Sequence, residues 1–244
     1  MIRKRLQATA RLYLRDFKYL SFLLVMIWVP YYAIYFLFRL GIFEKPYFAE
    51  GIDLAIFVEF LITPFASAIV LLILQSRNRQ SALKVQRILL RAIAIWPRLF
   101  INQLFVALYI LAGLLAFIVP GIYLGVRLAL VSPTVVFERK PLFGNFSRSF
   151  DLTRNNQQEV LLAGGTLFVF VMGIWGLILW ASFGPISKTS DWFFIAFMVT
   201  AMTVVKAAMI AVDILLFEFY ENFSSADARK NLEADDLIIS GEDP

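Results

Sequence analysis

Six long apolar stretches divide this chain, and they constrain its fold more than any other feature. A bilayer core about 30 Å thick is crossed by roughly 20 helical residues, and five of the stretches reach that length. The sequence therefore predicts an all-α polytopic membrane protein with a bundle of six transmembrane helices. The membrane domain covers residues 1–217, and an acidic cytoplasmic tail covers 218–244. The predicted spans are 20–40, 52–74, 99–119, 122–137, 160–180 and 192–217.

Composition agrees with a membrane protein and narrows the chemistry. Hydrophobic residues make up 60% of the chain and charged residues 17%, which excludes a soluble enzyme, a disordered chain and a disulfide-rich module. The chain contains no cysteine and no histidine, so it lacks the usual thiolate, metal ligand and general base. It also has no phosphate-binding glycine loop and no nucleophile motif. We therefore expect a non-enzymatic protein without cofactor or metal.

The fourth stretch, 122–137, needs a separate argument because it is short and carries Arg127. It follows the third stretch after only Pro120 and Gly121, a helix-breaking pair that suits a tight turn. The economical interpretation is a helical hairpin that returns to its starting side. The alternative is one long broken helix, which would give five crossings and place the C-terminus outside.

Basic residues alternate between the segments that connect the stretches. Lysine and arginine resist translocation and stay on the cytoplasmic side. The outer loops hold only Lys45 and Lys188, and the turn at 120–121 holds no base. This alternation holds only if all six stretches cross, which places both termini in the cytoplasm and explains the net charge of +5 without a nucleic-acid partner. The cytoplasmic bases are Arg3, Lys4, Arg5, Arg11, Arg15, Lys18, Arg77, Arg79, Lys84, Arg87, Arg91, Arg98, Arg139, Lys140, Arg148 and Arg154.

Glu59, Arg127, Lys206 and Asp213 fall inside the predicted spans, which makes them a candidate intramembrane polar site. Glu59 and Arg127 lie at similar depth, about 10 Å and 8 Å from the outer end of their spans at 1.5 Å per residue, so they are predicted to pair. Lys206 and Asp213 lie on one face of the last span, where Lys206 can extend towards Asp213. Each pair is either a substrate or ion site, or a structural contact between helices.

Two cytoplasmic segments are predicted to be interfacial helices. In 81–96, Lys84, Arg87 and Arg91 recur at helical spacing beside apolar residues, and they are the candidate contact for anionic lipid. The alternative is that these basic residues only set the topology of the chain and lie on a helix without recognising a lipid. In 142–150, apolar residues share a face opposite Arg148, and we expect this face to lie on the membrane or the bundle.

A pattern of short motifs resembles a known family. It runs from Pro120-Gly121-Ile122-Tyr123-Leu124 through Val126-Arg127-Leu128, Pro133 and Glu138 to Arg148-Ser149-Phe150-Asp151-Leu152-Thr153-Arg154. It resembles the YciC-like family of uncharacterised bacterial inner-membrane proteins, and the membrane domain that precedes some glycerophosphoryl diester phosphodiesterases. The resemblance implies a six-helix, multi-pass protein of the bacterial inner membrane with cytoplasmic termini. It implies no catalytic residue.

Two functions remain open. The first is a non-enzymatic protein that organises the membrane or envelope through partner contacts. The alternative is a transporter or lipid-handling protein, which the intramembrane charges and the prolines inside spans would suit. The expected partner is the bilayer itself, with anionic lipid at the cytoplasmic face. A protein partner or a second copy of the chain also fits the sequence.

Overall fold

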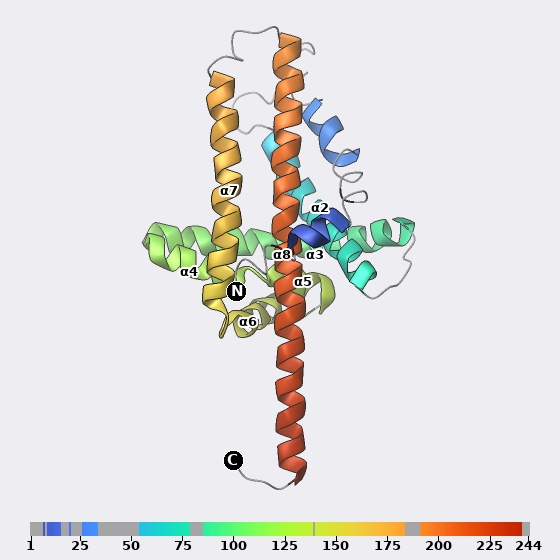
Figure 1. Ribbon diagram of the computed structural model, residues 1–244, viewed down its shortest axis with the longest axis vertical. Helices are drawn as coiled ribbons and strands as arrows, with labels where there is room; N and C mark the ends of the chain where they lie inside the picture. Colours follow the sequence, from blue (N-terminus) through green and yellow to red (C-terminus); the bar gives the residue numbers. More distant parts are fainter. Residues whose placement is uncertain are drawn as a thin grey trace. The chain divides into compact units, whose positions relative to one another are not determined.

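The computed structural model describes residues 7, 9–15, 20, 26–33, 54–78, 85–138, 140–183 and 191–240. Within these ranges the regular structure is entirely helical, which confirms the predicted all-α class (Figure 1). A short helical stretch at 26–33 precedes the labelled helices. These are α2 (Leu54–Asn78), α3 (Val85–Ala116), α4 (Ile118–Leu128), α5 (Val131–Phe137), α6 (Leu142–Thr153), α7 (Gln157–Phe183) and α8 (Asp191–Ser240).

Five helical segments in the part that the structure describes are long and apolar enough to cross a bilayer. They overlap the second to sixth predicted spans, and the chain is therefore a multi-pass membrane protein. The first predicted span, 20–40, lies mostly outside the described residues, so the count of six stays a prediction. The five segments are Phe57–Asn78, Val85–Ala116, Ile118–Phe137, Gln157–Ala181 and Ala196–Ala228.

The chain forms two compact units. Unit 1 comprises Met1–Val70 and Leu162–Ile214, and unit 2 comprises Leu71–Leu161 and Leu215–Pro244. Helices α2, α7 and α8 each contribute residues to both units.

In unit 1, α7 and α8 share an apolar core that includes Val171, Ile178, Ala201 and Val205. The direction of α2 relative to α8 follows from two polar contacts, because Glu59 contacts Lys206 while Ser67 contacts Asp213. The order is the same on both helices, so they run parallel.

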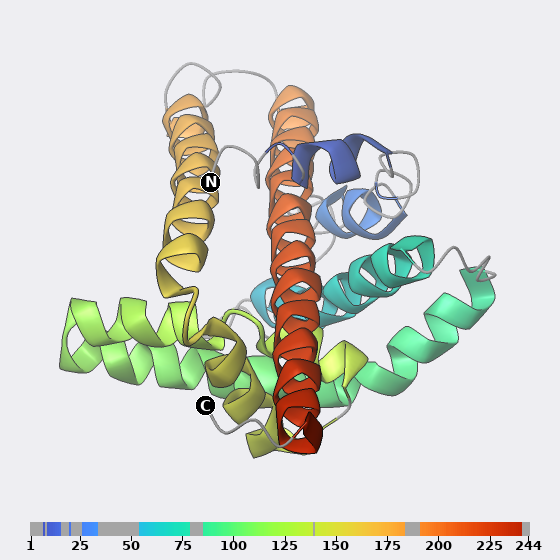
Figure 2. The same cartoon turned by 60° about the horizontal axis from the view of Figure 1, so that its bottom comes forward.

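In unit 2, α3 and α4 fold back on each other as the α3–α4 hairpin (Figure 2). The chain breaks at Phe117, whose φ of −164° and ψ of 155° are extended, three residues before the predicted turn. Pro120 and Gly121 lie inside α4 instead. A proline in the first turn of a helix costs no hydrogen bond, because its missing N–H has no intrahelical partner there. The predicted hairpin is thus present, with its turn shifted.

The two helices of the hairpin approach closely at a pair of glycines. A Cβ on Gly113 would lie 2.9 Å from the Cα of Gly121, and a Cβ on Gly121 would lie 2.8 Å from the backbone nitrogen of Leu114. Only glycine fits where backbones come this close.

Replacing Gly121 with alanine should therefore destabilise the protein. Overpacking typically costs about 1–3 kcal/mol, and the clash here includes backbone that cannot swing aside. Thermal unfolding in detergent would measure the loss. G164A is the matched control, because a Cβ there meets nothing within 4 Å. Equal melting temperatures for G121A and G164A would contradict the close approach.

The second half of the hairpin is interrupted between α4 and α5. Pro133 accounts for this break, because a proline ring clashes with the carbonyl four residues earlier, here that of Ala129. Helix α6 satisfies the groups that the break leaves open. Ser149 Oγ donates to the Arg127 carbonyl at 2.7 Å and accepts from the Leu130 N–H at 3.2 Å. The polar side of α6 is therefore a cap for a broken helix.

Helix α6 buries a side that combines polar and apolar residues. Its buried residues are Asn145, Phe146, Ser149, Leu152 and Thr153, whereas Phe143 is 70% exposed. The expectation that the apolar face of 142–150 lies on the membrane or the bundle stays a prediction, and the buried Ser149 contacts the backbone groups at the α4–α5 break.

Two helices extend beyond their predicted bounds. The predicted interfacial helix 81–96 and the span that follows it form one continuous helix, α3, which passes through Pro97. Similarly, α8 continues to Ser240, so much of the predicted tail is helical. The first part of that extension packs through buried aromatic side chains, namely Phe219, Tyr220 and Phe223.

Candidate functional site

The most buried charge among the described residues of unit 1 is Lys206 on α8. Its ammonium lies 2.5 Å from a carboxylate oxygen of Glu59 on α2 and 4.2 Å from the ring centre of Trp28. The Tyr32 hydroxyl donates to the same carboxylate at 3.3 Å. The Lys206 side chain is only 8% exposed, and Glu59 is 35% exposed. We call these four residues the Lys206 cluster.

Helical spacing builds the Lys206 cluster from three segments. Trp28 and Tyr32 are four residues apart on the 26–33 helix, so both rings face the same side, and they stack with centroids 5.9 Å apart. A cation above an aromatic face is attracted to it, and more strongly when water is excluded. The ammonium is thus held by a carboxylate on one side and an indole on another.

A second polar contact continues along the α2–α8 interface. Ser67 Oγ lies 2.9 Å from each carboxylate oxygen of Asp213. On α2, polar residues recur every four positions at Glu59, Thr63 and Ser67 and form a stripe along the helix. A search of the spans for charged residues finds Glu59 but not the two hydroxyl side chains. Thr63 is satisfied within its own helix by the Glu59 carbonyl at 2.8 Å.

The predicted partners differ from the observed ones. Glu59 was paired with Arg127 on depth, and Lys206 with Asp213 on helix face. The contact that the structure gives Glu59 is with Lys206, and Asp213 contacts Ser67. The depth of a residue in its span does not say which neighbouring helix its side chain faces. Depth therefore could not identify the partner of Glu59 among the charged residues of the other helices.

Arg127, the remaining residue of the predicted polar site, belongs to unit 2. Its guanidinium donates to the Phe150 carbonyl at 2.9 Å, and it lies 5.0 Å from the Phe150 ring centre and 5.6 Å from that of Tyr123. Phe150 is in the last turn of α6, where helix carbonyls lack intrahelical donors. Arg127 therefore links α4 to the end of α6.

Unit 2 contains a charged cluster that the sequence did not single out as a site. Glu138 accepts hydrogen bonds from Arg148 at 3.0 Å and from the Tyr220 hydroxyl at 3.0 Å, and its second oxygen lies 2.9 Å from Lys140. Arg148 also binds Asp227 at 2.6 Å. We call these five residues the Glu138 cluster. Glu138 precedes α6 and Arg148 lies within it, so their opposite charges ten residues apart are a signal in the sequence, whereas Asp227 is too distant along the chain to be found.

The surroundings of Glu138 change its acidity. Partial burial raises the pKa of the carboxyl group, but hydrogen bonds from Lys140 and Arg148, the Arg148 charge and the Tyr220 hydroxyl together hold it below its ordinary value. Glu138 is thus a stable carboxylate near neutral pH. It is unsuited to act as a proton donor, and its role is to join α5, α6 and α8.

The described residues hold no group of three or more acidic side chains that could bind a metal ion. The Lys206 and Glu138 clusters are charge pairs whose atoms already contact each other. Both clusters can stabilise helix packing.

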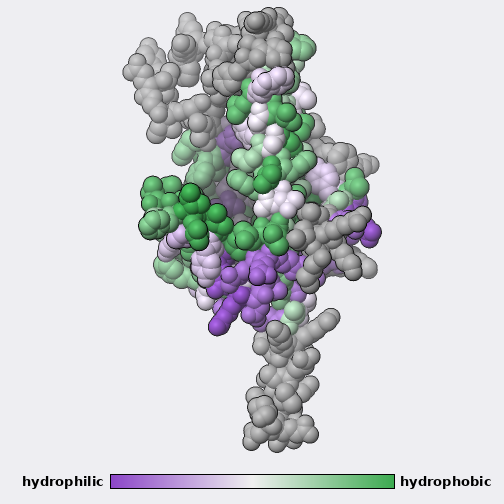
Figure 3. All heavy atoms as spheres, turned by 60° about the vertical axis from the view of Figure 1, so that its left-hand side comes forward, coloured by the Kyte–Doolittle hydropathy of each residue, from purple (hydrophilic) through white to green (hydrophobic). Residues whose placement is uncertain are grey.

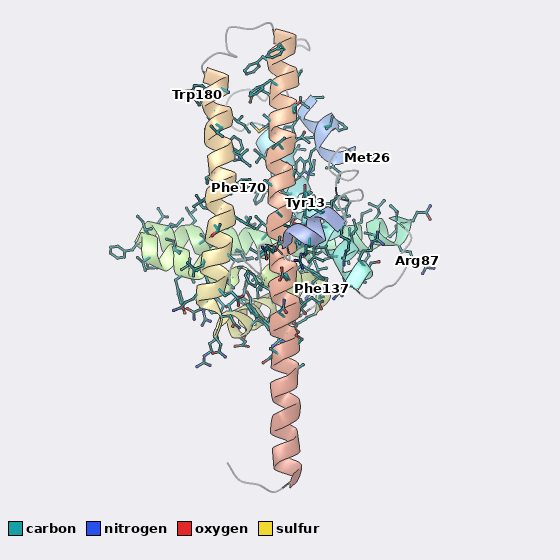
Figure 4. The ribbon with its side chains drawn as sticks, viewed as in Figure 1. Tyr13, Met26, Arg87, Phe137, Phe170 and Trp180 are labelled. Carbon is teal, nitrogen blue, oxygen red and sulfur yellow. The ribbon has the colours of Figure 1, made fainter. Side chains whose placement is uncertain are left out.

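The candidate lipid contact lies at the start of α3. Arg87 is exposed, Arg91 is half-buried, and Lys84 is outside the described residues. Figure 4 shows Arg87 projecting from the start of this helix. The side of α3 that faces protein carries Ile88, Ala92, Ile95 and Leu99.

No family model, curated protein or solved structure matches the chain. The resemblance to the YciC-like family therefore rests on the residues themselves. Those residues include Arg127, Ser149 and Thr153 at the α4–α6 contact and Glu138 and Arg148 in the Glu138 cluster. Their shared feature in the structure is that they hold α6 in place.

Proposed function

We propose that this chain is a non-enzymatic, multi-pass inner-membrane protein that organises the membrane through lipid contacts at its cytoplasmic face. The start of α3 carries this proposal. Opposite its buried stripe, α3 exposes Leu89 at 38%, Leu90 at 68% and Ile93 at 57%, beside the exposed Arg87. Apolar and basic side chains on one exposed surface suit the boundary between acyl chains and anionic headgroups.

The Lys206 cluster supports this function over transport. A transporter has to expose its charged groups to water or substrate during its cycle. Lys206 is instead held between Glu59 and Trp28 with 8% of its side chain exposed. An ion pair of this kind stabilises the packing of α2 against α8.

Anionic lipid should stabilise the protein through Lys84, Arg87 and Arg91. Each base near an anionic surface contributes about 1 kcal/mol, and salt weakens the attraction. We expect phosphatidylglycerol to raise the melting temperature of the purified full-length protein in detergent, and to raise that of the K84Q/R87Q/R91Q variant less. Phosphatidylcholine should change the melting temperatures of the native protein and of the triple variant by the same amount.

The charge-matched control is K188Q, since Lys188 lies in a loop predicted to face outwards. It should respond to phosphatidylglycerol like the native chain. The proposal fails if the triple variant gains as much stability from phosphatidylglycerol as the native protein at low salt.

A further inference from the structure

The end of the α3–α4 hairpin is apolar and uncovered by the rest of unit 2 that the structure describes. Phe117 is 76% exposed, Ile118 70% and Val119 76%. From Leu114 to Ile122 the sequence contains no polar or charged side chain. A turn that emerges into water ordinarily carries polar residues, because its backbone and side chains are hydrated. The composition of this turn suits hydrocarbon instead.

Polar structure begins a short distance behind this end. Arg127 follows Phe117 by ten residues, which is about 15 Å along a helix. At that height α6 is attached through Ser149 to the Arg127 carbonyl and through the Phe150 carbonyl to the Arg127 guanidinium. On the α3 side, Asn102 contacts the fully buried Asn145 of α6 at 3.2 Å.

Helix α6 is a poor candidate for the bilayer interior. Its outer surface carries the exposed Ser147 and Asp151, and the exposed Arg154 follows its last residue. Figure 3 shows hydrophobic side chains (green) over the end of the hairpin and hydrophilic side chains (purple) below it, in the region of α6. The length of the hairpin that can lie in hydrocarbon therefore ends where α6 is attached.

The distance of about 15 Å from the hairpin end to Arg127 is half the thickness of the hydrocarbon core. The hydrocarbon core is about 30 Å thick, so a hairpin whose end reached the far surface would hold α6 near the bilayer centre. Exposed charges and helix-end carbonyls there would lack partners. A hairpin inserted to about 15 Å leaves Arg127 and α6 at the headgroups, where both are hydrated.

We propose that the α3–α4 hairpin enters and leaves the bilayer from the cytoplasmic side, with its end among the acyl chains of the cytoplasmic leaflet. This rests on the proposed function in one respect, the cytoplasmic position of the basic start of α3. Two of the five helical segments then do not cross. The charge pattern holds with these two stretches not crossing as well as with six crossings, because the basic segments before and after the hairpin lie on one side in both cases. The parallel direction of α2 and α8 is preserved as well.

Cysteine labelling tests the position of the hairpin end, because the full-length chain contains no native cysteine. V119C removes little packing, since Val119 is 76% exposed. A membrane-impermeant maleimide should not label V119C in intact cells or in inverted vesicles, and should label it after detergent is added. The controls are K188C, expected to react from outside, and N155C, an exposed position expected to react from the cytoplasmic side.

Labelling of V119C from outside would show a full crossing and overturn the proposal. Labelling from the cytoplasmic side would place the end in water and overturn it as well. If N155C reacts only from outside, the orientation on which both proposals depend is wrong. If N155C behaves as expected while V119C reacts from outside, only the half-crossing hairpin fails.

Depth quenching gives the second readout. A fluorophore on V119C, in vesicles of phosphatidylglycerol and phosphatidylcholine, should be quenched more by lipids labelled near the end of the acyl chain than by lipids labelled at the headgroup. Stronger quenching by the headgroup label would overturn the proposal. Neither readout depends on whether Arg87 binds phosphatidylglycerol.

Discussion

Replacing Lys206 with methionine should destabilise the protein more than any other single change considered for unit 1. The substitution leaves the Glu59 carboxylate facing Trp28 and Tyr32 without its counter-charge. Removing one partner of a buried pair costs about 3–5 kcal/mol, and the 35% exposure of Glu59 reduces this to about 2–3 kcal/mol. Thermal unfolding in detergent would measure the loss.

The double variant E59Q/K206M should recover part of that stability. With both charges removed, neither side chain is left charged and unpaired, so the losses are not additive. K188M is the control, because it removes the same charge outside the predicted spans. Strictly additive losses would mean that Glu59 and Lys206 are not coupled.

The same double variant separates a structural contact from a substrate site. If the Lys206 cluster only holds helices together, cells that carry E59Q/K206M should regain function along with stability. If the charges bind a transported substrate, stability should return without function. That second result would favour the transporter alternative.

Replacing Glu138 with glutamine should destabilise unit 2 in a pH-dependent way. At pH 7 the carboxylate binds Arg148, Lys140 and Tyr220, and the amide can satisfy only part of this set. Charge-assisted hydrogen bonds contribute about 1.5–3 kcal/mol each, and the polar surroundings lower the net loss to about 2 kcal/mol.

The pH dependence follows from the direction of the pKa shift. The folded-state pKa of Glu138 lies below its ordinary value of 4.5, so the carboxylate contributes its stability above that value. As the pH falls through the folded pKa, the native protein loses this contribution and the gap between native and E138Q should close. E221Q is the control, because Glu221 accepts one exposed hydrogen bond from Asn78. A gap that stays constant down to acidic pH would contradict the role of the Glu138 carboxylate.

The helical class could be predicted from the sequence because a long apolar run in hydrocarbon can pair its backbone N–H and C=O groups within the segment only as a helix. The hairpin could also be predicted, but its turn could not be located within three residues. Proline stops a helix when it falls inside one, yet begins a helix equally well, and Pro120 does the latter. The extended backbone of Phe117 and the close approach of Gly113 to Gly121 distinguish the two.

The partners of the charged residues were harder to predict. Glu59 and Lys206 were both recognised as candidates, but each was assigned to a different neighbour. Hydropathy specifies how deep a residue lies, whereas the rotation of each helix about its axis depends on all of its contacts. Trp28 and Tyr32 gave no signal, since aromatic residues in an apolar helix are ordinary.

The parallel pairing of α2 with α8 has a consequence for synthesis. Ser67 and Asp213, which bind each other, are 146 residues apart in the chain, and Glu59 and Lys206 are 147 apart. At about 5–20 residues per second, a ribosome needs roughly 7–30 s to make the intervening chain. Throughout that interval the Glu59 carboxylate on α2 lacks the Lys206 ammonium as its counter-charge. A chain cut short before Lys206 would keep the Glu59 carboxylate without this counter-charge and would pack α2 without α8.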